Sequence, residues 1–170
     1  ASAGAMAQDY PQRTIRIIVP TGPGGGYAVD GRIVGDQLSR RLGQGVVVEN
    51  RTGAGTVVGT QFAIAAPADG YTLLVGGLSN IVFNANLYSK APYDAQKSLA
   101  PIVINYKNSY MVVTAPQSPI KSIKDLIETA KAKPGALNLG TPGVGTGQQL
   151  SAVAFMRATG ISMTEIPYRG

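Results

Sequence analysis

The sequence predicts an α/β fold with a parallel sheet, and three features of the chain lead to it. Strand-like apolar segments alternate with helix-like segments between residues 14 and 75, the order typical of parallel strands joined by crossover helices. The first segment, 14–19, runs apolar at its end, as expected for a strand covered on both faces. Glycine-rich stretches at 22–26 and 143–147, called the first and second glycine turns below, each lead from a strand into a helix.

The elements of the first half follow from periodicity and stop signals. The strand at 14–19 precedes a helix at about 28–42, which Gly43 terminates. A strand at 46–49, a helix from about 53 to 66 and a strand at 71–75 complete a β-α-β-α-β order. The side chains expected to face the sheet are Val29, Ile33, Val34, Leu38 and Leu42 in the first helix and Val58, Phe62 and Ala65 in the second.

The second half repeats the strand, turn and helix pattern. Short strands are expected at 102–104 and 111–113, and the polar segment between them is interpreted as the crossing into a second domain. Ser122 and Asp125 have the spacing of a capping box, so a helix begins there and ends at Pro134. Thr146 and Gln149 cap another helix, which extends to Gly160 before a strand at 163–166. The side chains expected to face inward are Ile123, Leu126, Ile127 and Ala130 in the first of these helices and Leu150, Val153 and Ala154 in the second.

Both glycine turns are candidate anion sites. Successive glycines allow backbone amides to converge on a bound oxygen, and the following helix presents its positive end. Carboxylate and phosphate both suit such a site, and a pair of turns suits a ligand with a carboxylate at each end. The alternatives are a plain strand-to-helix turn at 22–26 and a capped helix end at 143–147.

Composition excludes several classes of function. Lys and Arg number 15 against 9 Asp and Glu, a net charge of +6, but the surplus is scattered and forms no basic stripe, so no nucleic acid partner is expected. Cysteine and histidine are both absent, which removes disulfides, zinc clusters and imidazole-based triads. We therefore expect no catalytic residues, no metal and no cofactor. No apolar run approaches the roughly 20 residues of a membrane span, so no direct membrane insertion is expected.

A dinucleotide-binding enzyme is the alternative from a different class. Gly22-x-Gly24 follows the first strand and Glu49 ends the second, where an acidic residue could hold a ribose. The third glycine of that motif would fall at Tyr27, and Pro23 removes an amide that the pyrophosphate would use. A nucleotide-dependent Rossmann-like α/β enzyme therefore stays the second hypothesis.

Motifs along nearly the whole chain carry a resemblance to one family. They are Tyr10-Pro11, Val19-Pro20 with Pro23-Gly24-Gly25, Arg32, Val46 to Arg51 with Gly53-Ala54-Gly55, Ala66 to Leu74, Leu87-Tyr88 with Pro92-Tyr93-Asp94, Ala130 to Gly135, Leu137-Asn138 and Pro167 to Gly170. In this order they resemble the Bug (TctC-type) substrate-binding proteins of tripartite tricarboxylate transporters.

The resemblance implies a type II periplasmic binding protein fold, with two Rossmann-like lobes that close on a small carboxylate. It implies a periplasmic, non-enzymatic protein whose partners are the carboxylate and membrane transporter subunits. The expected division is a signal-peptide remnant or cloning scar at 1–7, a first lobe at 8–103 and the start of a second lobe at 104–170, with the match ending inside that lobe. Ala5-Met6-Ala7 resembles a signal-peptide cleavage site.

The candidate ligand residues come from the glycine turns and from a loop after the third strand. Family residues carry over to Gly24, Gly25, Gly26, Thr141, Gly143, Gly145 and Thr146, and the same stretches add Thr21 and Tyr27. Gly77 and Ser79 follow the third strand, where ligands gather in open α/β sheets, although Ser79 is equally suited to cap a helix.

Departures from the family pattern make the expected site less polar. Ala28 stands where the family commonly has Asp, and Val144 and Gly147 replace residues that are often Asn and Ser. These departures leave room for an aliphatic or aromatic carboxylate and count against a hydroxy-tricarboxylate or an amino acid.

Overall fold

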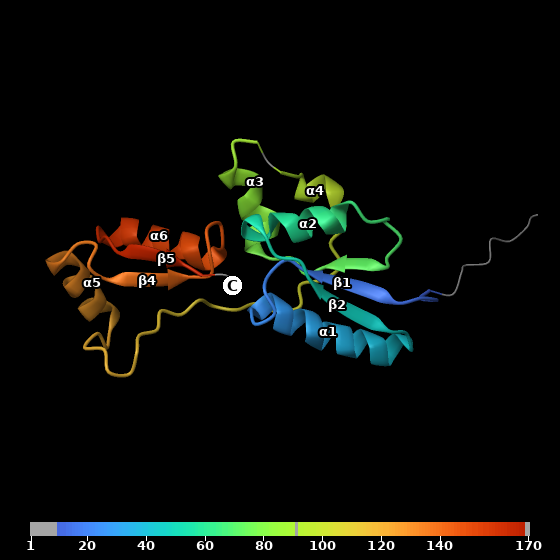
Figure 1. Ribbon diagram of the computed structural model, residues 1–170, viewed down its shortest axis with the longest axis horizontal. Helices are drawn as coiled ribbons and strands as arrows, with labels where there is room; N and C mark the ends of the chain where they lie inside the picture. The colour runs from blue at the N-terminus through green and yellow to red at the C-terminus, as the bar shows by residue number, and fades with distance from the viewer. Residues whose placement is uncertain (1–9, 91, 169–170) are drawn as a thin grey trace, which may run out of the picture. The chain divides into compact units, whose positions relative to one another are not determined.

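A computed structural model describes residues 10–90 and 92–168, which form two compact units (Figure 1). The first unit ends at Gly76 and the second begins at Gly77. The predicted segment 1–7 lies outside the described residues. The expected boundary at 103/104 separates the two ligand-binding lobes, which are not the same as these compact units, and it stays a prediction.

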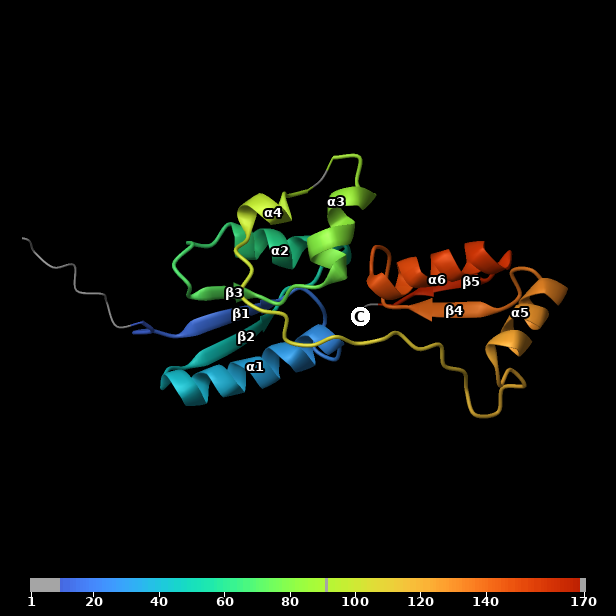
Figure 2. The same cartoon turned by 180° about the vertical axis from the view of Figure 1, so that it is seen from behind.

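The first unit is a parallel sheet with strand order β2-β1-β3, formed by β1 (Ile15–Val19), β2 (Val46–Asn50) and β3 (Thr72–Leu74). The central strand β1 pairs with β2 on one side and β3 on the other. Its residues Ile18 and Val19 are completely buried. The helices α1 (Gly26–Leu42) and α2 (Val57–Ile64) cover opposite faces of the sheet, as Figures 1 and 2 show. The predicted β-α-β-α-β order and the parallel sheet are confirmed.

The buried face of α1 differs from the predicted one. Ala28, Gly31 and Gly35 are buried, whereas Val29 and Ile33 are 50% and 59% exposed. A β-carbon at Gly31 would lie 2.8 Å from Val19 Cγ2, so the helix packs on the sheet through its smallest residues. Leu42 is also exposed, while Val34 and Leu38 pack partly buried against the core. The periodicity of large apolar residues therefore predicted the helix correctly and its inner face wrongly.

Close backbone packing also decides the inner face of α2. A short 3₁₀ turn, η1 (Ala54–Thr56), precedes the helix. Gly59 and Thr60 are buried, and Val58 is 46% exposed. The predicted inward positions of Val58 and Ala65 are wrong, because glycine allows a closer approach to the sheet than a valine side chain does; Phe62 is half-buried.

The second unit begins with short helical segments and ends with a strand, helix and strand. Its elements are the π-helix η2 (Leu78–Phe83), α3 (Asn84–Leu87), α4 (Ala95–Ser98), α5 (Ile123–Ala132), β4 (Asn138–Thr141), α6 (Gly147–Thr159) and β5 (Thr164–Pro167). β4 and β5 pair in parallel, with Asn138 opposite Thr164. The predicted helices after Ser122 and Thr146 and the strand near 163–166 are confirmed.

The predicted strands at 102–104 and 111–113 are wrong. Neither segment has strand structure or a ladder partner among the described residues. Ile102, Val103 and Ile104 are 78%, 73% and 78% exposed. A strand needs a hydrogen-bonded neighbour as well as β-branched residues, so composition alone misled here.

The inner faces of α5 and α6 are partly as predicted. Leu126 and Ala130 are buried in α5, and Ile127 is half-buried. Ile123 and Ala154 are exposed, so their predicted inward positions are wrong. In residues 10–90 and 92–168, no helix combines the length and apolar character needed to span a bilayer.

Candidate functional site

The first glycine turn leaves the start of α1 without a side-chain cap. Gly25 is the N-cap residue in an extended conformation, with φ −76° and ψ 164°, and its amide donates to Gly22 O at 3.3 Å. The first turn of α1 holds no acidic residue. The positive end of a 17-residue helix is therefore uncompensated by any carboxylate of its own first turn.

Side chains from neighbouring elements hold this turn in place. Asn50 Nδ2, at the end of β2, donates to Thr21 O at 2.8 Å, and Arg32 Nη1 donates to Pro23 O at 2.9 Å. Thr21 Oγ1 is buried and has no hydrogen-bond partner among the described residues. The sequence interpretation assigned Asn50 and Arg32 no contact with the first glycine turn. The one signal for such a contact was a polar Asn at the end of the strand beside the turn.

Tyr27 and Ala28 lie against the core of the first unit. Ala28 is completely buried in a cluster with Ile17, Val19 and Val75, and Tyr27 packs partly buried against that cluster. The position where the family commonly has Asp therefore holds a methyl group inside the core. The ligand-binding role expected for Thr21, Gly24, Gly25, Gly26 and Tyr27 stays a prediction.

The second glycine turn is largely satisfied by its own unit. Thr146 caps α6, because its Oγ1 accepts from Gln149 N at 3.4 Å and also donates to Gly143 O at 2.7 Å. Gly143 and Gly145 adopt φ of 123° and 81°, conformations that glycine reaches without strain. The capped helix end, which was the alternative to an anion site at 143–147, is therefore present in the structure.

The structure joins the loop after β3 to the second glycine turn. Ser79 Oγ accepts a hydrogen bond of 3.1 Å from the amide of Gly147, the first residue of α6. Gly77 N donates to Asn80 Oδ1 at 2.9 Å, which caps η2. The ligand-binding role expected for Gly77, Ser79, Gly143, Gly145 and Thr146 stays a prediction, and the contact between Ser79 and Gly147 is a finding of the structure.

Glu165 is a neighbour of the second glycine turn that the sequence interpretation missed. Its carboxylate accepts from Thr141 Oγ1 at 3.0 Å and from Gln149 Nε2 at 3.2 Å. Gln149 Oε1 in turn accepts from Gly145 N at 3.4 Å. The hydroxyl hydrogen of Thr141 is thus directed at Glu165, and its predicted ligand role stays a prediction. No spacing rule links strand β5 to this turn, so only the fold reveals the contact.

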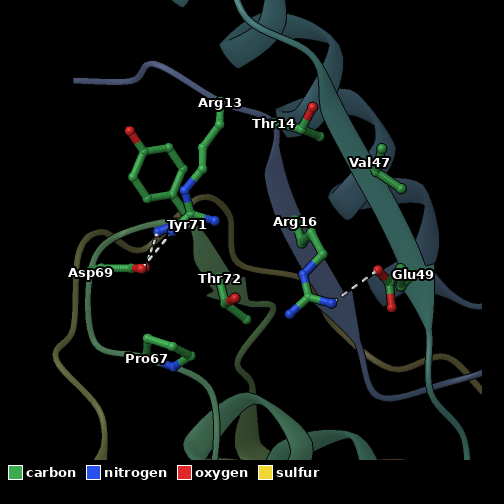
Figure 3. A pocket seen from close by; sticks show the side chains of 9 residues that line it. All are labelled: Arg13, Thr14, Arg16, Val47, Glu49, Pro67, Asp69, Tyr71 and Thr72. Atoms are coloured by element: carbon green, nitrogen blue, oxygen red, sulfur yellow. Dashed lines mark hydrogen bonds and ion pairs between the residues drawn. The ribbon is translucent and has the colours of Figure 1, made fainter. Parts of the chain in front are cut away.

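A pocket of about 400 Å³ lies on the sheet face that α1 does not cover (Figure 3). Its lining residues Arg16, Glu49 and Thr72 alternate along the strands with the residues that face α1. Its charges are paired: Arg13 Nη2 lies 2.6 Å from Asp69 Oδ2, and Arg16 Nη1 lies 3.7 Å from Glu49 Oε1. None of the predicted ligand residues lines this pocket, which is a polar, solvated part of the sheet.

Perturbed carboxyl groups occur at helix caps. The backbone amide of Lys97 lowers the pKa of Asp94, and that of Lys121 lowers the pKa of Asp125. Asp94 caps α4, and the carboxyl of Asp125 lies in the first turn of α5. Among residues 10–90 and 92–168, no three acidic side chains gather into a possible metal site.

A family model and curated relatives from sequence comparison match most of the chain. Residues 31–170 match the TctC family, described as tripartite tricarboxylate transporter family receptor. The chain is 36% identical to BugT of Bordetella pertussis over 170 residues, which cover 99% of this chain and 52% of BugT. A UPF0065 protein of the same species is 34% identical over 172 residues, which cover 100% of this chain and 52% of that protein. The chain thus spans about half the length of these relatives.

Solved structures agree with the sequence matches. A protein from R. palustris solved with adipate superimposes with a TM-score of 0.91 at 29% identity, over 95% of this chain and 54% of that one. MatC from Rhodopseudomonas palustris with bound malate gives 0.80 at 25% identity, over 95% and 55%. The periplasmic binding protein BugD gives 0.77 at 27% identity, over 95% and 54%. The predicted periplasmic-binding-protein fold is confirmed by these likenesses.

Proposed function

The chain belongs to the tripartite tricarboxylate transporter receptor family, and on that premise we propose that it is a periplasmic solute-binding protein. It captures a small carboxylate between two lobes and presents the loaded form to a tripartite tricarboxylate transporter. Capture is an equilibrium in which no covalent bond is made or broken, so the protein is not an enzyme.

The observation that carries the proposal is the uncapped N-terminus of α1. A carboxylate at the first glycine turn would accept from backbone amides that no side chain caps, and it would meet the positive end of a long helix. The amides of Gly24 and Gly26 have no hydrogen-bond partner in the described part of the chain. Asn50 and Arg32 hold the turn through its carbonyl groups, which keeps its amides available.

The residues of the two turns favour an aliphatic dicarboxylate. Residues 21–27 and 141–147 contain no charged side chain. The first turn provides uncapped amides for a carboxylate, and the one carboxylate beside the second turn, Glu165, already accepts from Thr141 and Gln149. Ala28 is buried and Val144 is 71% exposed. Both side chains are apolar, so neither offers a hydrogen bond to a hydroxyl group of a ligand. The relative solved with adipate supports the same class of ligand.

A thermal-shift panel tests the proposal. Adipate, malate, citrate, glutamate and NAD are compared at equal concentration, and we expect adipate to raise the Tm most. A ligand at a hundred times its Kd adds about 2.7 kcal/mol to the stability of the folded state. Stabilisation by NAD together with no response to the carboxylates would overturn the proposal in favour of a nucleotide-dependent protein.

A further inference from the structure

A buried polar cluster lies behind the second glycine turn. Asn80 and Asn84 are completely buried and Ser79 is 6% exposed. All three belong to η2 or directly follow it, and η2 is a π-helix, a rare conformation that is frequent at functional sites. Buried amide and hydroxyl groups are costly unless they are hydrogen-bonded, so their partners define what the cluster holds in place.

The hydroxyl of Tyr93 ties this cluster together. Tyr93 Oη donates to the backbone carbonyl of Asn80 at 2.7 Å and accepts from Asn84 Nδ2 at 3.0 Å. The backbone amide of Asn84 donates to the carbonyl of Ser79. One phenol group from the segment before α4 therefore bonds Asn80 within the π-helical turn that carries Ser79 and Asn84 directly after it.

The cluster forms a hydrogen bond to the second glycine turn and lies close to it at Gly145. Ser79 Oγ accepts from Gly147 N at 3.1 Å. A β-carbon at Gly145 would lie 3.9 Å from Asn84 Oδ1 and 3.6 Å from Leu87 Cδ1. The turn is therefore seated against η2 and α3, and its shape depends on where Asn84 and Ser79 are held.

We infer that Tyr93 is a positioning residue for the second glycine turn. Its hydroxyl holds Asn84 and the π-helix, and these hold Ser79 against the first amide of α6. Tyr93 itself is outside the turn, so its effect on a ligand passes through Ser79 and the Gly147 amide. The effect on ligand affinity rests on the proposed function, whereas the effect on the Gly147 amide does not.

Hydrogen exchange on the full chain tests the structural part. Tyr93→Phe removes the hydroxyl and keeps the ring, and Tyr10→Phe is the matched control, because Tyr10 Oη donates to Gly70 O at 2.7 Å in the first unit. The exchange rate of the Gly147 amide is measured against that of Thr164 N, which donates to Leu137 O at 2.8 Å. We expect Tyr93→Phe and Ser79→Ala to speed Gly147 relative to Thr164 by about five-fold or more, the effect of one net hydrogen bond.

Two results would overturn the inference. One is an unchanged Gly147 rate in Tyr93→Phe, and the other is an equal acceleration of Gly147 and Thr164, which indicates a general loss of stability. If Tyr93→Phe does not fold, Asn84→Asp replaces it, since it keeps the side-chain size and removes the amide that donates to Tyr93. The same ratio of rates then decides.

A binding measurement separates this inference from the proposed function. Calorimetry measures the affinities of adipate and hexanoate. Tyr93→Phe is expected to weaken the binding of adipate by about five-fold, which corresponds to the loss of one net hydrogen bond, and to leave the affinity for hexanoate unchanged. The reason is that only adipate has a second carboxylate for the second turn. If the unsubstituted chain binds neither acid, the proposed function is wrong, and the exchange rates still decide the role of Tyr93. If both acids weaken equally, Tyr93 does not position this turn for a ligand.

Discussion

At Gly59 the backbone of α2 passes so close to the end of β1 that no side chain fits between them. A β-carbon there would lie 2.5 Å from Arg51 O and 2.8 Å from Pro20 Cα. These are backbone atoms held in the sheet region, so Gly59→Ala is expected to destabilise the first unit by about 1–3 kcal/mol. Gly24→Ala, with nothing within 4 Å of the new carbon, is the control and should change stability by less than about 0.5 kcal/mol. Urea denaturation compares the two, and equal losses would contradict the packing described for α2.

Gly25 tests the role of the first glycine turn at the same scale. Its β-carbon would lie 3.4 Å from Thr21 Oγ1, and Gly45 offers a matched site, 3.5 Å from Thr14 Oγ1 at the opposite end of the sheet. Gly25→Val is expected to weaken adipate about tenfold, or about 1.4 kcal/mol, because its side chain keeps the carboxylate away from the amides. Gly45→Val should leave the affinity unchanged. Equal affinities of the two folded variants would remove the first turn from the site.

The cap of α6 belongs to the scale of the element. Thr146 Oγ1 accepts from Gln149 N and donates to Gly143 O, so Thr146→Ala is expected to cost about 1 kcal/mol of stability. Thr146→Ser keeps the hydroxyl and should restore most of that loss. If the turn also binds ligand, calorimetry of Thr146→Ala should show a further loss of adipate affinity. A loss of stability with unchanged adipate affinity would show that Thr146 caps the helix and does not contribute to ligand binding.

The start of α5 makes a pH-dependent contribution to stability. The Lys121 amide, donating at 2.9 Å, lowers the pKa of Asp125 below its ordinary value of 3.8. Since the folded pKa is depressed, the contribution is complete above 3.8 and is lost as the pH falls through the folded value. NMR titration of the Asp125 carboxyl should therefore give a midpoint below 3.8. A midpoint at or above that value would contradict the cap geometry.

At the scale of the whole molecule, apolar residues at 102–104 and 111–113 are exposed and pair with no strand in the part of the chain that the structure describes. Val103 is 73% and Met111 83% exposed, and exposed β-branched runs favour association. We expect concentration-dependent association in sedimentation, and Val103→Lys should reduce it. Gln37→Lys adds the same charge on the exposed side of α1 and serves as the control. Equal sedimentation of both variants would exclude 102–104 as the associating segment.

Local signals were sufficient for the order of the strands and main helices of the first unit and for α5, β4, α6 and β5 of the second. Gly43 and Gly160 end α1 and α6 in left-handed conformations, and Ser122 and Thr146 cap their helices through their side chains. These features act between residues a few positions apart, so they can be predicted from spacing. The glycine turns were found for the same reason, because several glycines between a strand and a helix are visible as a local pattern.

The sequence by itself determined a parallel α/β chain of the Bug type with a glycine turn before each of two helices. Only the tertiary structure decided that Gly31 and Gly59 face the sheet, that Ser79 meets Gly147, and that Glu165 meets Thr141. These contacts join residues 24 or more positions apart in the site, and they depend on how closely backbones approach. Helical periodicity predicts the buried face of a helix from the positions of apolar side chains. In α1 and α2 the buried face is instead set by residue size, because glycine lets the helix approach the sheet closely. A glycine has no apolar side chain, so the sequence pattern does not mark it as buried.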